Sequence, residues 1–287
     1  MTTRSPTERL EPALRRFAEA RTDLSPGGIE ALRTAINARR KQAADTLDVG
    51  DLVITERSIH GVTVRIYRAP GAVGAALYCH SGAFVLGNLD IDHRQCVELA
   101  RRAQCTVVSV DYGLVPELAF PAALDDVLAV LDAMAADGDP VAVAGSSAGG
   151  ALAALVAQRG DVVFQLLHQP VLDDRPTPSK REFRTTPGFD GDACDLMWQL
   201  LGADAVAPGR TEDLTGCPPA FITCSELDPL RDEAIDYATA LLRAGVSTEL
   251  HVVPGTCHGF DSLLPDWEVS QQVFAMQGAA LRRALRD

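Results

Sequence analysis

Along most of this chain, short apolar segments typical of strands alternate with longer segments whose apolar residues recur at helical spacing. This alternation predicts an α/β fold, in which a mostly parallel sheet is covered by helices on both faces. Such sheets carry ligands at the carboxyl ends of their strands, so the chemistry should lie in the loops that follow the strands. The expected strands are 75–79, 106–110, 141–144, 162–167, 220–224 and 248–253, and the expected helices are 121–136, 148–158, 231–243 and 267–285.

The first part of the chain predicts two helices, within residues 6–44. Apolar residues at helical spacing over 10–18 indicate the first one. The second opens at Ser25 and Pro26, where a serine suits the N-cap and a proline the first helical turn.

A hairpin is expected next, because residues 52–69 alternate in strand fashion on either side of His60-Gly61. These two strands would be antiparallel and would extend one edge of the sheet.

One long stretch, residues 173–217, interrupts the alternation. It is rich in proline and charge, with a helical patch only at 193–201. A segment of this length is either a functional lid or disordered. Phe183, Phe189 and Trp198 make it too apolar for disorder, which favours a lid.

Composition narrows the class of partner. The chain has 287 residues, with 26 Lys+Arg and 39 Asp+Glu, a net charge of −13 and a pI of about 4.9. Nucleic acids and anionic membranes bind positively charged protein surfaces, so we expect neither as a partner of this acidic chain. We find no apolar run near the ~18 residues of a membrane span and no apolar core of a signal peptide at the N-terminus, so we expect a cytoplasmic protein.

The cysteines predict no metal centre, because none of the seven forms a C-x-x-C pair or has zinc-ligand spacing. An odd number of cysteines, several of them inside apolar runs, indicates buried free thiols in a reducing compartment.

The strongest local signal is a G-x-S-x-G pattern, formed by Gly145, Ser147 and Gly149, between an expected strand and an expected helix. This is the pattern of a nucleophile elbow, a sharp turn that exposes a serine hydroxyl. The two glycines remove side chains that would clash where the strand and the helix approach. The N–H groups of the helix that follows favour developing negative charge.

A serine hydroxyl needs a base, and the base needs a carboxylate to orient it. His258 lies in a glycine-flanked loop after strand 248–253, where a catalytic base would be placed. Asp228 follows strand 220–224, and Pro229 biases it away from helix. Glu226 is the alternative carboxylate. For the oxyanion, we expect N–H donors from Ala148 and from the loop 80–84.

Together these motifs resemble the hormone-sensitive-lipase family of α/β-hydrolases, the bacterial carboxylesterases with an H-G-G-G motif. The similar segments occur in the family's order between residues 75 and 260. They are H-S-G-A at 80–83 for H-G-G-G, D-Y-G-L-V-P-E at 111–117 for D-Y-x-L-A-P-E, F-P-A-A-L-D-D at 120–126 for its usual continuation, G-S-S-A-G-G at 145–150 for G-D-S-A-G-G, residues 226–233 for E-x-D-P-L-R-D-E, and H-G-F at 258–260.

The resemblance implies an α/β-hydrolase fold with a small helical cap and no metal or organic cofactor. The cap would be N-terminal helices in residues 1–44, and the catalytic domain would be residues 45–287, with a lid insertion at about 173–217. The implied catalytic triad is Ser147, Asp228 and His258, and the implied oxyanion donors are Gly82, Ala83 and Ala148.

Three residues depart from the family's motifs: Ser81, Ala83 and Ser146. Ala83 keeps the N–H that an oxyanion donor needs, but its methyl group crowds the acyl or leaving group. Ser81 is either tolerated or holds the loop by a local hydrogen bond. Ser146 removes a negative charge beside the nucleophile.

Other residues are expected to support the structure or to line a substrate pocket. Asp111 and Tyr112 are expected to be structural supports, and Asp90, Asp92 and His93 are expected in a solvated loop rather than a metal site. The candidate apolar walls of a substrate pocket are Phe84, Leu86, Phe183, Phe189, Trp198 and Leu230.

These residues predict a serine carboxylic-ester hydrolase that acts on soluble short-chain esters through an acyl-enzyme. Two alternatives stay open at this point. The same site could serve a biosynthetic acyltransferase, lactonase or dehydratase. A non-catalytic receptor for a small ligand is the other, although receptors resembling this family lose the histidine that is present here. A homodimer is also left open.

Overall fold

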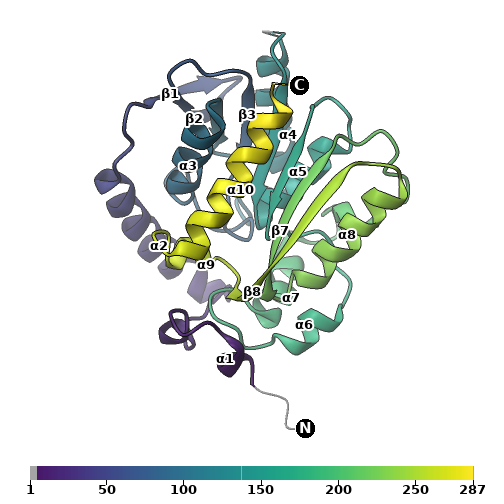
Figure 1. The fold of residues 1–287 in the computed structure, drawn as a ribbon. Helices are drawn as coiled ribbons and strands as arrows, with labels where there is room; N and C mark the ends of the chain where they lie inside the picture. Colours follow the sequence, from purple (N-terminus) through teal and green to yellow (C-terminus); the bar gives the residue numbers. More distant parts are fainter. Residues whose placement is uncertain (1–4, 137, 287) are drawn as a thin grey trace.

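The computed structural model describes residues 5–136 and 138–286, and it has the α/β architecture that the alternating pattern predicts (Figure 1). Within this part of the chain, eight strands form one sheet in the order β1-β2-β4-β3-β5-β6-β7-β8. Strand β2 is antiparallel to β1 and β4, and the other neighbours are parallel. The strands are β1 (Val53–Ile59), β2 (Val62–Arg68), β3 (Ala75–Cys79), β4 (Thr106–Val110), β5 (Val141–Ser146), β6 (Gln165–His168), β7 (Ala220–Leu227) and β8 (Thr248–Cys257).

The predicted hairpin is confirmed at one edge of this sheet. Ile59 pairs with Val62 across a two-residue turn. The turn residues His60 and Gly61 have φ angles of 49° and 88°. Two successive positive φ angles give the turn a twist that matches the flanking strands.

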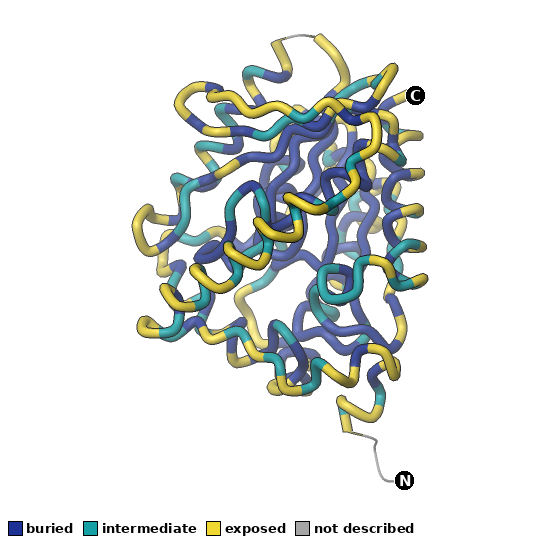
Figure 2. Tube along the Cα trace, turned by 90° about the vertical axis from the view of Figure 1, so that its left-hand side faces the viewer, coloured by how far each residue is buried: buried dark blue, intermediate teal, exposed yellow. Residues whose placement is uncertain are grey.

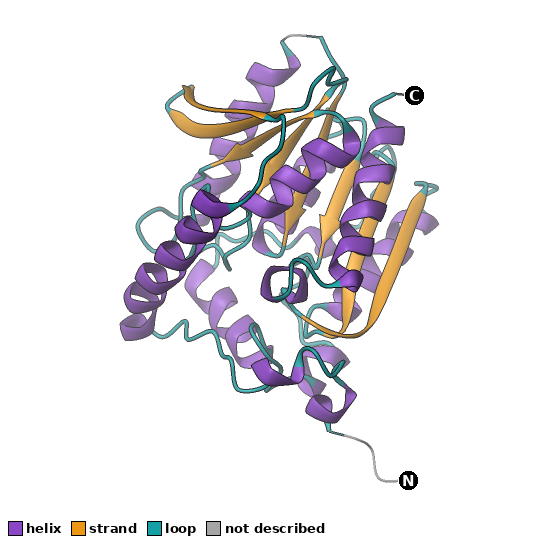
Figure 3. Cartoon of the chain, turned by 60° about the vertical axis from the view of Figure 1, so that its left-hand side comes forward, coloured by secondary structure: helices purple, strands orange, loops and turns teal. Residues whose placement is uncertain are grey.

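Helices cover both faces of the sheet (Figure 3). One hydrophobic cluster joins α3 (His93–Ala103) and α10 (Glu268–Ala284) to one face. A larger cluster joins α4 (Phe120–Ala135), α5 (Ala148–Ala157) and α8 (Arg231–Arg243) to the other. Four of these helices were expected within two residues of their observed bounds, whereas α3 was not predicted.

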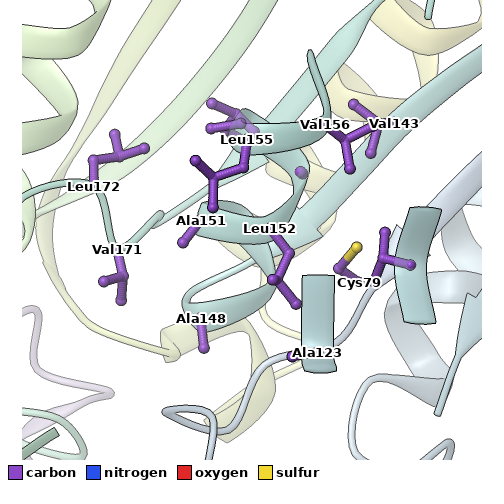
Figure 4. Close-up of a cluster of buried hydrophobic side chains, with 14 of the residues drawn as sticks. Cys79, Ala123, Val143, Ala148, Ala151, Leu152, Leu155, Val156, Val171 and Leu172 are labelled. Carbon is purple, nitrogen blue, oxygen red and sulfur yellow. The ribbon is translucent and has the colours of Figure 1, made fainter. Parts of the chain in front are cut away.

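Helix α5 lies in the middle of the larger cluster, and every one of its residues is buried. Its Leu152 and Val156 lie beside Val143 and Cys79 of the sheet (Figure 4). The small alanines of α5 allow close approach, and burial of each large apolar side chain stabilises the fold by about 1.5–3 kcal/mol. The central strands are buried, as the dark blue segments of Figure 2 show. Because α5 packs on these strands, its first turn is held in a fixed position.

The remaining helices lie at the end of the sheet where the parallel strands finish (Figure 1). Among them, α2 confirms the expected helix after Ser25, although the Ser25 side chain makes no capping bond. They are α1 (Pro6–Arg9), α2 (Pro26–Thr46), α6 (Pro178–Glu182), α7 (Gly191–Leu201), α9 (Phe260–Leu263) and the 3₁₀ turns Arg15–Phe17 and Pro208–Arg210. The boundaries of a cap at 1–44 and a lid at 173–217 stay predictions, and residues 1–4 lie outside the described part.

The expected helix at 10–18 is wrong. Only the short helix α1 and the 3₁₀ turn Arg15–Phe17 form there, and Leu10 has an extended backbone. Pro12 explains the break, because proline disfavours helical geometry at the residue before it and lacks an N–H. Leu10 and Leu14 are still buried, in a cluster with Phe183.

The expected solvated loop at Asp90, Asp92 and His93 is also wrong. Asp92 and His93 are buried at the start of α3. His93 lies 2.9 Å from the hydroxyl of Tyr67, and Asp90 forms an ion pair with Arg65. Within residues 5–136 and 138–286, no group of His, Cys, Asp or Glu side chains is arranged to hold a metal ion.

All seven cysteines are free, and only Cys217 is partly exposed. None of the described helices combines the length and the apolar content that a membrane crossing requires.

Candidate active site

The turn between β5 and α5 has the geometry of an elbow. Ser147 occupies it with φ 54° and ψ −117°, a backbone conformation that side chains rarely adopt. Its N–H donates to His168 O at 2.9 Å, which holds the strained turn against the neighbouring strand. A Cβ atom on Gly145 would lie 2.1 Å from Gly149 O, and one on Gly149 would lie 2.0 Å from Cys79 O. Both positions therefore require glycine.

The Ser147 hydroxyl begins a chain of hydrogen bonds that joins three strand ends. Ser147 Oγ lies 2.9 Å from His258 Nε2, and His258 Nδ1 lies 2.8 Å from Asp228 Oδ2. Asp228 is fully buried, and its Oδ1 accepts a bond from Leu230 N at 2.8 Å. The structure thus brings together the serine, the histidine and the aspartate that the sequence singles out.

Glu226, the alternative carboxylate, points elsewhere. Its Oε2 accepts a bond from Gly255 N at 2.8 Å, and its Oε1 forms an ion pair with Arg9 at 3.1 Å. It therefore ties helix α1 to the end of strand β8, which directly precedes His258, and it makes no hydrogen bond to the imidazole.

The environment of His258 favours its protonated form. Burial alone would lower the pKa of the imidazole, but the negative charge of Asp228 and its hydrogen bond outweigh burial. The net result is a pKa raised above the ordinary value of 6.5. Asp228 can therefore stabilise an imidazolium that forms when the serine loses its proton.

The loop after β3 faces the same point. Ala83 and Phe84 have φ angles of 52° and 61°, so two successive residues lie in the left-handed region. Tyr112 supports this loop, because its hydroxyl donates to His80 O at 2.6 Å and its ring stacks on the His80 ring. Tyr112 is thus the structural support that was expected.

Asp92 holds the same loop from the other side. Its Oδ2 accepts bonds from Ser81 N at 2.7 Å and from the Tyr78 hydroxyl at 3.1 Å, and its Oδ1 accepts from Ser81 Oγ at 2.8 Å. Ser81 therefore anchors the loop through a residue eleven positions along the chain, not through a local bond. This role of Asp92 was not predicted from the sequence.

A cavity of about 160 Å³ opens over Ser147 and His258. The oxyanion candidates Gly82 and Ala83 line it, as do two predicted wall residues, Leu86 and Phe189. The Phe189 ring centre is 5.2 Å from that of His258. A larger hollow of about 850 Å³ lies among Pro140, Ser247 and other residues at the amino ends of the strands, and none of the three hydrogen-bonded residues lines it.

The other predicted wall residues are not in the lining of the smaller cavity. Phe84 is buried against Phe120, and Leu230 and Trp198 pack on the larger core cluster. Phe183 is covered by the Arg9 and Arg231 guanidinium groups and is fully buried. Apolar character in the sequence did not reveal which way these side chains face.

Gln169, which the sequence analysis missed, fixes the loop that carries His258. Its Oε1 accepts from Gly259 N at 2.6 Å, and its Nε2 donates to Ser225 Oγ at 3.0 Å. Its φ is 47°, and it lines the cavity. Its place directly after β6 was the available signal, because ligands gather at strand ends.

A second missed pair lies just behind it. His168 Nε2 is 3.1 Å from Asp261 Oδ1, and His168 Nδ1 is 2.7 Å from Thr223 Oγ1. Burial alone would raise the pKa of Asp261, but the charge and hydrogen bond of His168 and the bond from Gln95 lower it to about 2. The pair joins β6 to α9, the helix that follows His258.

Comparisons with known proteins agree with this fold. A family model described as alpha/beta hydrolase fold matches residues 76–262. Esterase LipI of Mycobacterium tuberculosis is 38% identical, covering 81% of this chain and 81% of LipI. Ethyl acetate hydrolase of Pseudomonas putida is 34% identical, covering 83% of each chain. The crystal structure of esterase LipW from Mycobacterium marinum has a TM-score of 0.93 and 51% identity, covering 98% of each chain.

Proposed function

The chain belongs to the hormone-sensitive-lipase family of α/β-hydrolases, and on that premise we propose that it is a carboxylesterase that cleaves short-chain esters through a serine acyl-enzyme. The observation that carries the proposal is the unbroken chain of hydrogen bonds from Ser147 through His258 to the buried Asp228. The relatives named esterase and ethyl acetate hydrolase support the same reaction class.

In the first half of the reaction, Ser147 Oγ attacks the ester carbonyl while His258 Nε2 takes its proton. Asp228 holds the imidazole by Nδ1 and stabilises the positive charge. The N–H groups of Gly82, Ala83 and Ala148 face the developing oxyanion. Ala148 is the first residue of α5, so its N–H has no acceptor within the helix. His258 then gives the proton to the departing alcohol.

In the second half, water takes the place of the alcohol. His258 removes a proton from the water, the hydroxide attacks the acyl carbonyl, and Ser147 regains its proton as the acid leaves. No step in this sequence needs a metal or an organic cofactor. The small cavity over Ser147 supports short acyl groups as the preferred substrates.

The alternatives of the sequence analysis receive less support. A receptor without catalysis would not need an imidazole placed 2.9 Å from the serine hydroxyl. Acyl transfer uses the same triad, so a nucleophile competition separates it from hydrolysis. Location in the cytoplasm and assembly as a homodimer stay predictions.

The test is turnover of a p-nitrophenyl ester series by the wild-type protein and by Ser147→Ala. Loss of the nucleophile should lower kcat by several orders of magnitude, while the thermal midpoint stays within a few degrees. A fluorophosphonate probe should label Ser147, as read by peptide mass spectrometry. The matched control Ser146→Ala should keep labelling. Residual activity of Ser147→Ala within tenfold of wild type would refute the proposal.

A further inference from the structure

Two arginines of α2, Arg39 and Arg40, line the cavity that holds Ser147 and His258. Among the described residues, neither arginine side chain forms a hydrogen bond or an ion pair. Arg39 is exposed at the mouth of the cavity. The Nε–H of Arg40 is buried and has no acceptor. The cavity that holds the reacting serine is therefore lined by a cation without a partner anion.

A partly buried cation without a partner is costly. Charged groups removed from water are ordinarily paired, because neither Coulomb attraction nor hydrogen bonds otherwise replace their hydration. Burial lowers the pKa of the Arg40 guanidinium, and the nearby charge of Arg39 acts in the same direction. Arginine nonetheless stays protonated, because its ordinary pKa is so high. Arg40 thus offers donors that no group of the described chain accepts.

The nearest carboxylates are engaged by other donors. Asp261 also lines the cavity, but His168 binds its Oδ1 and Gln95 binds its Oδ2. Asp92 is engaged by the hydroxyl and N–H of Ser81. Both carboxylates attract Arg40 at a distance, but neither forms an ion pair with it. The position next to Arg40 is therefore suited to an anion from outside the chain.

We propose that the cavity takes esters that carry a carboxylate, with the ester carbonyl at Ser147 and the carboxylate against Arg40. The inference rests on the proposed esterase function and names the substrate class of that site. The guanidinium fork matches a carboxylate with two parallel hydrogen bonds. Water cleaves the ester as before, so a half-ester gives a dicarboxylate and an alcohol. Arg39 at the mouth attracts the anion on entry.

The experiment compares esters that differ by one charge. On the acyl side, monomethyl glutarate is anionic and dimethyl glutarate is neutral; methanol release gives the rate. On the alcohol side, 4-acetoxybenzoate is anionic and its methyl ester is neutral. The measured quantity is the ratio of kcat/KM for the anionic ester to that for the neutral ester. The pair with the higher ratio shows which side of the substrate carries the charge.

The wild-type protein should favour the anionic ester of one pair. Arg40→Gln should lower that ratio about tenfold or more, because a charge-assisted bond is lost. Arg40→Lys keeps the charge and should retain part of the preference. Arg159→Gln removes one exposed positive charge outside the cavity lining and should leave the ratio unchanged. A ratio unaffected by Arg40→Gln, or a wild-type preference for the neutral ester in both pairs, overturns the inference.

A binding measurement separates this inference from the proposed function. In Ser147→Ala, where turnover is blocked, titration calorimetry is carried out with monomethyl glutarate and with 4-acetoxybenzoate. For at least one of these anionic esters, the Kd should become about tenfold weaker once Arg40→Gln is added. If the wild-type protein hydrolyses no ester, the proposed function fails and the calorimetry still decides the inference. If neutral esters are hydrolysed and Arg40→Gln leaves the Kd of both anionic esters unchanged, only the inference fails.

Discussion

The backbone N–H and the hydroxyl of Ser81 both donate to the carboxylate of Asp92, at 2.7 and 2.8 Å. Ser81 is the residue before Gly82 and Ala83, two of the proposed oxyanion donors. Asp92 touches no reacting atom, so it acts as a positioning residue for their N–H groups. Where the family has a glycine, this chain has Ser81, and its hydroxyl adds a hydrogen bond to Asp92 that fixes the loop after β3.

Asp92→Asn should therefore lower kcat by about tenfold to a hundredfold with little change in KM. An amide has only one accepting oxygen for the three donors, and a displaced oxyanion donor costs up to ~10²–10³ in kcat. Ser81→Ala, which removes only the hydroxyl, should have a smaller effect. Asp90→Asn is the matched control on the same segment. If KM rises and kcat does not fall, Asp92 has no role in positioning the donors.

The second prediction distinguishes the two carboxylates. Asp228→Asn should reduce kcat by about 10⁴, because an amide favours the wrong imidazole tautomer. Glu226→Gln keeps an acceptor for Gly255 N and loses mainly the ion pair with Arg9, so kcat should stay within about threefold. Steady-state kinetics on p-nitrophenyl butyrate measures both. A larger loss of kcat in Glu226→Gln than in Asp228→Asn would show that Asp228 is not the carboxylate of the triad.

The third prediction concerns pH. His258 must be neutral to act as a base, and its pKa is raised above 6.5 by Asp228. The profile of kcat/KM should therefore fall on the acid side with a midpoint above 6.5, and Asp228→Asn should move that midpoint to lower pH. The free energy of unfolding should depend on pH in the opposite direction. The raised pKa stabilises the fold at pH below about 6.5, and this contribution is lost as pH rises through the folded-state pKa.

The elbow and the strand ends could be predicted from the sequence because both follow from local signals. Strand β5 and helix α5 differ sharply in residue pattern, and Gly145 and Gly149 mark where their backbones meet. His258 and Asp228 follow expected strands, and a parallel sheet brings such residues to one edge. The hydrogen bonds between them are consistent with that logic.

The parts that were missed depend on tertiary packing. Asp92 and His93 look like loop residues in the sequence, and only the packing of α3 on the sheet buries them. A phenylalanine suits both a cavity wall and a hydrophobic core, so the sequence alone could not show that Phe84 and Phe183 lie in the core. The position of Arg40 in the cavity lining was not predicted from the sequence, because an arginine on a helix usually faces water.

The fourth prediction concerns how α6 is held near the site. Lys180 Nζ lies 2.6 Å from Glu233 Oε2 of α8, and both residues are buried. Lys180→Met should lower the free energy of unfolding by about 3–5 kcal/mol, because it leaves a buried carboxylate unpaired. The double variant Lys180→Met/Glu233→Gln should recover part of the loss. Urea titrations give both values; a loss below about 1 kcal/mol in the single variant would contradict the expectation.

The last prediction concerns substrate size. Each buried CH₂ contributes about 0.8 kcal/mol, so a long pocket would give kcat/KM that rises with acyl length. The cavity here is about 160 Å³, and Ala83 and Phe189 narrow it beside the nucleophile. We expect activity on p-nitrophenyl esters to peak at about two to six acyl carbons and then to fall, because added methylenes clash or stay exposed.

Variants of the cavity wall test this explanation. Ala83→Gly and Phe189→Ala should each move the optimum toward longer or bulkier acyl groups, because each removes atoms that line the cavity. Trp198→Phe is the matched control, since Trp198 packs on the core outside the lining and should not shift the optimum. A wild-type preference for acyl chains of about ten carbons or more would show that the cavity opens further than this, as in enzymes that act on long-chain lipids.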